Sequence, residues 1–244
     1  NPSSAGFANE DKNNAQELYN DDIFVGYRYY DTFGVDVSYP FGYGGSYTSF
    51  AMSTKSVKAD KDKVTVQVKV KNTGTVSGKE VAEVYFSAPD GELDKPYQEL
   101  AGYAKTDELA PGESQILTIS FDTKEMGSYD TDKAAYVMED GDYIIRVGNS
   151  SRNTHVAAKL NVAEDTITEQ YSNLMVPVTE NDNIENSDKY PTLEPMTTEG
   201  ATSITYDGEA NEIAAAKTIE VDFTGYKAVS YTHLRAHETL MNLV

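Results

Sequence analysis

Four valines alternate with polar residues between positions 64 and 71, and this two-residue period constrains the fold more than any other feature of the chain. The apolar set is Val64, Val66, Val68 and Val70. Successive side chains of a β-strand point to opposite faces, so the pattern predicts a half-buried strand with one wet face. A slip of one residue would expose all four valines, each worth roughly 1.5–3 kcal/mol when fully buried. The register of this strand is therefore strongly specified.

Similar short rows follow, separated by turn residues such as Asn72-Thr73-Gly74 and Asp140-Gly141. The expected inward rows are Ala82, Val84 and Phe86; Leu117, Ile119 and Phe121; and Tyr143, Ile145 and Val147, with shorter strands at 100–104, 136–138 and 156–162. Seven or so short strands at this spacing predict an all-β fold, an antiparallel two-sheet sandwich over residues 46–162. Tyr143 suits a tyrosine corner, in which a phenol bonds the backbone; an ordinary core tyrosine is the alternative.

The composition excludes several function classes. Forty acidic residues face 20 Lys and Arg, and so negative a surface repels nucleic acid and anionic membranes. The absence of cysteine excludes disulfides and thiolate metal sites but fits a cytoplasmic or a secreted protein, so the compartment stays open. No apolar run approaches the roughly 20 residues that span a bilayer, and the printed chain has no leader sequence. We expect a soluble protein.

The segments flanking the sandwich differ from it in composition. Residues 22–31 form an aromatic run that should pack against something, and residues 39–47 alternate glycine with aromatics as a tether. Residues 163–228 read as an acidic linker followed by the start of another segment. Within it we expect a short helix at 209–217 and a strand at 218–223, neither with an obvious partner in this chain, so the renewed apolar stretch resembles the approach to another folded domain.

The last residues, 229–244, need a separate explanation. The string VSYTHLRAHET (residues 229–239) is similar to one translated frame of the transposase adapter used in sequencing-library preparation. We expect the natural sequence to stop near residue 228 and read no function from this segment.

Two early motifs carry a family resemblance. DIFVGYRYYD (residues 22–31) and YPFGYG (residues 39–44), the latter followed by SYT, resemble the end of the α/β sandwich domain of family 3 glycoside hydrolases. The later strings GKEV (78–81), LAGY (100–103) and YIIRVGNSS (143–151) resemble the fibronectin type III-like domain of the same enzymes. One departure is Gly45, where the family usually has Leu. On this resemblance residues 1–45 are the C-terminal tail of an α/β domain, and residues 46–162 are a fibronectin type III-like, immunoglobulin-like domain.

The resemblance implies a parent enzyme of β-glucosidase or β-xylosidase type. Such enzymes hydrolyse O-glycosyl bonds with retention, using an Asp nucleophile on a barrel domain and a Glu acid/base on the α/β domain, two carboxylates about 5–5.5 Å apart. Neither position falls in this chain, so we expect no catalytic residue, no cofactor and no metal ligand here, and a fragment that is inactive by itself. The expected partners are the α/β and barrel domains of the same parent and its oligo- or polysaccharide substrate. For domain order we expect the barrel to come last; a short C-terminal extension after the sandwich is the alternative.

Few residues are candidates for a site. Asp21, Asp22 and Asp31 near Arg28 could form a carboxylate site, but a solvated loop with a structural Arg is the favoured interpretation. The acidic stretch between 165 and 199 lacks the Gly-centred spacing of a calcium loop.

The histidines offer no site either. His233 and His237 lie in the adapter-like string, which leaves His155 alone, without partners for a zinc site or a catalytic triad. Two other functions remain as alternatives: an immunoglobulin-like module of a surface or adhesion protein, and a stand-alone carbohydrate-binding module whose tyrosines stack on sugars.

Overall fold

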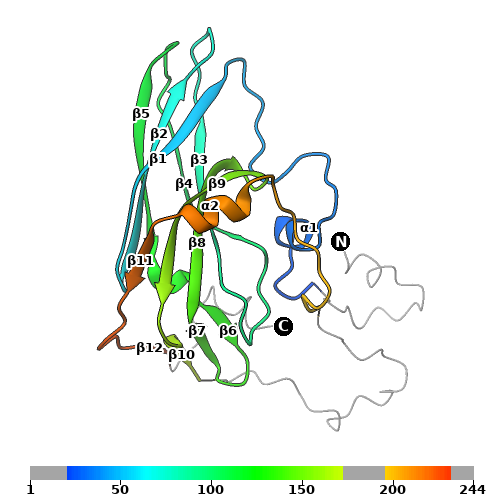
Figure 1. Cartoon of the computed structure of the whole chain (residues 1–244), viewed down its shortest axis with the longest axis vertical. Coiled ribbons are helices and arrows are strands. Elements are labelled where there is room, and N and C mark those ends of the chain that lie inside the picture. The colour runs from blue at the N-terminus through cyan, green and yellow to red at the C-terminus, as the bar shows by residue number, and fades with distance from the viewer. Residues whose placement is uncertain (1–20, 173–195, 232–244) are drawn as a thin grey trace, which may run out of the picture.

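The computed structural model describes residues 21–172 and 196–231, and two packed sheets dominate it (Figure 1). The smaller sheet has the order β1-β2-β5 and is antiparallel throughout. Its strands are β1 (Phe50–Ala59), β2 (Lys63–Asn72) and β5 (Ser114–Asp122). The larger sheet has the order β11-β9-β8-β3-β4. Its strands are β3 (Val81–Ser87), β4 (Glu99–Lys105), β8 (Gly141–Ser150), β9 (Asn153–Val162) and β11 (Thr218–Val221). All its pairs are antiparallel except β11 with β9, which is parallel.

The core lies between these two sheets, where the valines of β2 face the inward rows of the larger sheet. All four valines, Val64 to Val70, are fully buried. Val66 sits between Val57 of β1 and Ile119 of β5, so neighbouring strands present apolar residues to the same face. The expected register and the all-β sandwich are thus confirmed. Strand β1 was not among the expected strands, because its burial alternates between half-buried and exposed rather than between core and solvent.

A third, four-stranded sheet lies at the lower end of the sandwich in Figure 1. Its order is β12 (Val229–Tyr231), β10 (Thr166–Tyr171), β7 (Ala135–Met138) and β6 (Ser128–Asp130), and the 3₁₀-helix η2 (Thr123–Met126) leads into it from β5. Tyrosine rings from all four strands contact one another. Nothing in this pairing bears on the origin of residues 229–231, and the rest of the adapter-like string lies outside the described residues.

Tyr143 at the start of β8 makes the tyrosine corner. Its side chain is fully buried, and its hydroxyl donates to the carbonyl oxygen of Glu139 at 3.3 Å. This bond spans the turn that leads into β8, as the motif requires. The corner, rather than an ordinary core tyrosine, is therefore present.

The outer face of the larger sheet is also buried, although an antiparallel sheet commonly exposes one face to solvent. Glu83 and Tyr85 of β3 and Arg146 of β8 all point away from the core, yet each is at least nine-tenths buried. Two segments from opposite ends of the chain cover them. One is residues 21–45, here called the leading segment, with the helix α1 (Tyr27–Thr32); the other contains α2 (Glu209–Ala215) (Figure 1).

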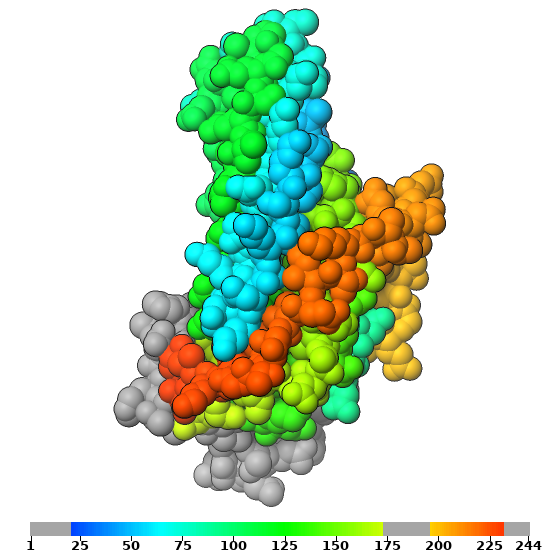
Figure 2. All heavy atoms as spheres, turned by 60° about the vertical axis from the view of Figure 1, so that its left-hand side comes forward, coloured from blue at the N-terminus to red at the C-terminus, as the bar shows by residue number. Residues whose placement is uncertain are grey.

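The segment 196–231 belongs to the sandwich rather than to an unattached linker. In Figure 2 it crosses the molecule in orange beside the cyan strands β1 and β2. Strand β11 pairs with β9, and Val221 enters the core, with Ile219 and Phe223 packed against it. The expected strand at 218–223 and the helix near 213 are present, but the expectation that they have no partner in this chain was wrong. The central part of the expected linker, 173–195, lies outside the described residues.

Within the described ranges, no helix is long and apolar enough to cross a membrane.

Candidate functional site

The leading segment is fixed to the outer face of the larger sheet through Tyr27. The Tyr27 ring packs edge-on against Tyr85 of β3, with 6.1 Å between the ring centroids, and stacks on Phe41 at 4.7 Å. The backbone N–H of Leu100 in β4 donates to the Tyr27 hydroxyl at 2.8 Å. Burial raises the pKa of Tyr27, so the phenol stays neutral. These contacts explain why the aromatic run of this segment is so dense.

Asp31 and Arg28 each make an ion pair with the sandwich. The Nε of Arg152, which follows β8, donates to Oδ1 of Asp31 at 2.8 Å. Arg28 pairs instead with Glu99 of β4, with 3.1 Å between Nη1 and Oε2. The arginine expected to act within its own segment therefore reaches across to the sheet.

The three aspartates of the candidate carboxylate site are not brought together in one pocket. Asp31 lines the pocket described below, whereas Asp21 and Asp22 do not. The carbonyl of Asp21 accepts from the N–H of Phe24 at 2.7 Å, and Asp22 has a left-handed backbone with φ 46°. Burial raises the pKa of the Asp22 carboxyl. These two residues form the turn before α1, which favours the structural interpretation.

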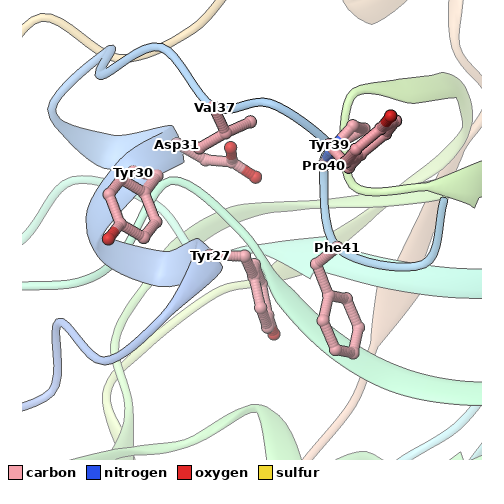
Figure 3. Close-up of a pocket in the computed structure, with 7 residues that line it drawn as sticks. All are labelled: Tyr27, Tyr30, Asp31, Val37, Tyr39, Pro40 and Phe41. Atoms are coloured by element: carbon pink, nitrogen blue, oxygen red, sulfur yellow. The ribbon is translucent and has the colours of Figure 1, made fainter.

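A pocket of about 210 Å³ opens between α1 and the chain that follows it (Figure 3). Its lining residues are Tyr27, Tyr30, Asp31, Val37, Tyr39, Pro40 and Phe41. Four of these seven are aromatic, and Asp31 is the one carboxylic acid side chain among them. Figure 3 shows the Asp31 carboxylate directed toward the space between the tyrosine and phenylalanine rings.

One carboxylate oxygen of Asp31 has no hydrogen-bond partner among the described residues. Its side chain is 2 % exposed, and Oδ1 is held by Arg152. The other oxygen, Oδ2, accepts no hydrogen bond from any described residue. A buried carboxylate oxygen without a donor is costly, so the pocket is a place where a donor would be strongly favoured.

A second buried cluster fastens α2 to the same sheet face. Nη2 of Arg146 lies 2.6 Å from Oε1 of Glu209, and the hydroxyl of Tyr97 donates to the same oxygen at 2.6 Å. The Arg146 guanidinium also lies 4.9 Å from the centre of the Tyr97 ring and donates through Nε to Ser87. Both ends of the ion pair are at least nine-tenths buried. With its charges paired, the cluster holds α2 in place.

The remaining candidates form no site. His155 on β9 is half-buried, and its Nε2 lies 3.0 Å from the Thr54 hydroxyl of β1, so it joins the two sheets rather than lying free on the surface. His233 and His237 are outside the described residues. Asp165 accepts from the N–H of Asp140 at 2.9 Å, a turn contact. In residues 21–172 and 196–231, no three His, Cys, Asp or Glu side chains are grouped as metal ligands would be.

Sequence reasoning missed Arg152, Tyr97 and Glu209. One signal was present: Arg146 stands between two apolar residues in a strand whose alternate positions are core. A charged residue on the outward face of such a strand is ordinary by itself. However, Tyr85 of β3 lies opposite Arg146 on the same outward face, and a tyrosine beside it indicates that this face is covered. The partners themselves come from distant segments and leave no local pattern.

Comparison with known proteins identifies the sandwich. Residues 80–151 match the family described as fibronectin type III-like domain. A β-glucosidase of Ruminococcus albus is 42 % identical over 184 residues, and β-glucosidase A of Butyrivibrio fibrisolvens is 40 % identical over 199 residues. The matches cover 73 % and 72 % of this chain but 19 % and 24 % of the relatives.

Solved structures agree. A β-glucosidase from Paenibacillus barengoltzii is 45 % identical, with a TM-score of 0.65, and the match covers 70 % of this chain and 20 % of that one. A family 3 (GH3) β-glucosidase from Bifidobacterium adolescentis is 30 % identical, with a TM-score of 0.60, over 75 % of this chain and 26 % of that one. The chain thus spans about a fifth to a quarter of the length of the proteins it resembles.

Proposed function

Because the chain belongs to glycoside hydrolase family 3 as a segment that contains its fibronectin type III-like domain, we propose that it is a non-catalytic accessory part that holds the end of the neighbouring α/β domain. The short share of each relative that the chain covers supports the accessory assignment. The relatives are named β-glucosidases, which supports a parent of β-glucosidase or β-xylosidase type over an adhesion module or a stand-alone sugar-binding module.

The observation that carries the proposal is the attachment of the leading segment through Arg152. Besides Asp31, this arginine donates through Nη2 to the carbonyls of Tyr30 and Val35, at 3.2 and 2.6 Å. One side chain of the sandwich therefore fixes both ends of the turn that follows α1. If residues 1–45 are the end of an α/β domain, the sandwich positions that domain.

Three ion pairs that hold buried carboxylates support a non-catalytic role. A retaining glycosidase needs one carboxylate free to attack and one free to exchange a proton. Here Asp31 is paired with Arg152, Glu209 with Arg146 and Glu139 with Lys95, all within the described part of the chain. Carboxylates paired in this way hold structure together.

Two measurements test the proposal. The purified chain should not hydrolyse aryl β-glucosides or aryl β-xylosides; turnover that disappears when one carboxylate within residues 21–231 is neutralised would contradict it. In addition, residues 21–231 should replace the matching segment of the P. barengoltzii enzyme with activity retained. Arg152→Met in that chimera should lower its melting temperature and activity together, and Arg28→Met should have a smaller effect.

A further inference from the structure

We propose that the pocket around Asp31 is a socket for one basic side chain, an Arg or a Lys, from a part of the parent enzyme that this chain does not contain. Three observations support it: the Oδ2 atom of Asp31, which accepts no hydrogen bond from a described residue on a side chain only 2 % exposed; the aromatic rings around it; and the size of the pocket. A cation close to a ring face is attracted by the ring quadrupole, and it also supplies the N–H donor that Oδ2 requires.

The pocket chemistry favours a cation over a sugar. A pyranose carries hydroxyls around its whole rim, and each one taken out of water needs a partner. The lining offers the Asp31 carboxylate and the hydroxyls of Tyr27, Tyr30 and Tyr39, of which the Tyr27 hydroxyl already accepts from Leu100; its other side chains are apolar. Several hydroxyls of a buried sugar would therefore be left unpaired. A side chain with an apolar stem and a single cationic head matches this distribution.

The size and charge agree with that occupant. About 210 Å³ is below the roughly 300–1,000 Å³ of pockets for drug-sized ligands, and it suits a single side chain. The chain has a formal net charge of −20, which attracts cations at long range. Asp31 keeps Arg152 on Oδ1 while a second donor approaches Oδ2, since a carboxylate has acceptor sites on both oxygens.

The identity of the occupant rests on the proposed function. The pocket is formed by the leading segment, which would be the end of an α/β domain, and the relatives are about four to five times longer than the part that matches. Tyr39, 70 % exposed, and Phe41, 45 % exposed, form an apolar rim that a neighbouring domain would cover. We therefore assign the basic side chain to that domain.

The socket proposal can be tested on the isolated chain with a small cationic probe. Ethylguanidinium chloride is titrated to tens of millimolar at constant ionic strength, and backbone and ring chemical shifts of residues 27–41 are followed by NMR. N-ethylurea, which has the same shape without charge, and methyl β-glucoside are the comparison ligands. We expect saturable shifts with the guanidinium and none with the other two.

Matched variants locate the site. Asp31→Asn retains an Oδ1 acceptor for Arg152 but replaces the free oxygen with an NH₂ donor, so affinity should fall at least tenfold. Tyr39→Ala should weaken binding several-fold without unfolding, since this ring is mostly exposed. Asp36→Asn and Tyr47→Ala remove the same groups from exposed positions outside the lining and should leave affinity unchanged.

The outcomes are separable. Saturable binding of methyl β-glucoside that Asp31→Asn abolishes would overturn the basic-side-chain proposal in favour of a sugar site. Absence of localised shifts with the guanidinium, or equal loss in Asp31→Asn and Asp36→Asn, would also overturn it. Neither result affects the accessory role, because the chimera and activity measurements test that role independently.

Discussion

Arg152 and Asp31 lie 121 residues apart in sequence, and the 2.8 Å bond from Nε to Oδ1 joins the sandwich to the leading segment. The same stretch is held from the other side, where the N–H of Ile204 donates to the Asp31 carbonyl at 2.9 Å. A Cβ on Gly34, whose φ is +61°, would lie 2.5 Å from the carbonyl oxygen of Thr202. The two segments that cover the larger sheet therefore also contact each other. The leading segment is thus held both by Arg152 of the sandwich and by residues of the segment that carries α2.

The ion pair predicts a local rather than a global response to mutation. Arg152→Met should leave the Asp31 charge buried without its partner, and breaking such a pair costs about 3–5 kcal/mol when the charge cannot escape. Here α1 can detach and rehydrate Asp31, so the loss is limited by the docking energy of the segment. We expect amide exchange in residues 27–35 to accelerate at least tenfold while exchange in β2 stays unchanged.

Arg28→Met is the matched control. The pair of Arg28 with Glu99 is about one-third exposed at both side chains, where solvent screens the charges. Exchange in α1 should change little. Equal acceleration by both variants would show that Arg152 has no special role, and acceleration throughout β2 would show that the segment does not detach separately.

The core register gives a second prediction. Val66→Asp places a charge at a fully buried position between Val57 and Ile119, and no basic side chain pairs with it there. The cost should be about 4 kcal/mol or more. Gln67→Asp, one residue on and exposed, should shift the free energy of unfolding by about 0.5 kcal/mol or less. Denaturant melts give both values, and similar midpoints for the two variants would contradict the register.

The third prediction concerns Glu209, whose carboxylate satisfies Arg146 and Tyr97. Glu209→Ala should detach α2, because it leaves the guanidinium of Arg146, whose side chain is 3 % exposed, buried without a carboxylate partner. We expect α2 amides to lose protection and the melting temperature to fall. Glu220→Ala on β11, at an exposed position, is the control. Unchanged protection of α2 in Glu209→Ala would show that the cluster is not what holds it.

The sequence was sufficient for the core and insufficient for what covers the outer sheet face, and the reason is physical. Residues such as Val66 and Ile119 follow the two-residue period because one face is core and the other is solvent. In β3 the outward residues Glu83 and Tyr85 are buried as well, by contacts with segments far away in sequence. Such contacts depend on tertiary packing, so a local period cannot show them.

The segment 209–223 is a second case in which a local sequence pattern does not show which residues are buried. Its apolar residues predict a following domain, and the expectation that the barrel comes last depends on that prediction. In the structure Val221 is a core residue and β11 completes the edge of the larger sheet. The apolar stretch therefore requires no further domain. A short parallel edge strand has too few residues to display a period of its own.

Gly45 gives a fourth prediction, drawn from the position where the family usually has Leu. A Cβ at Gly45 would meet no described atom within 4 Å. Gly45→Leu should therefore change the melting temperature of this chain very little, corresponding to about 0.5 kcal/mol or less. In the chimera with the P. barengoltzii enzyme, where further domains are present, the same change should be stabilising. Stabilisation of the isolated chain would show that the leucine's partner lies within it.

His155 gives the last prediction, on pH. Burial lowers its pKa from the usual value, with Glu212 opposing the shift, while Nε2 contacts Thr54 across the two sheets. The folded state therefore resists protonation more than the unfolded chain, whose histidine titrates near ~6.5. In the window between the two pKa values the unfolded state binds more protons, so the free energy of unfolding rises with pH. The stabilisation is complete above about pH 7.5 and is lost as pH falls through the folded-state pKa. Glu83, a buried carboxyl whose pKa is raised by burial, contributes with the opposite sign. The measurement is thus a difference: wild type minus His155→Gln, whose amide can still bond Thr54, followed by urea melts from about pH 5.5 to 7.5. The difference should grow toward the upper end of the range; a flat difference would show equal pKa values in the two states, a falling one a folded-state pKa above the unfolded one, and either result would contradict the prediction.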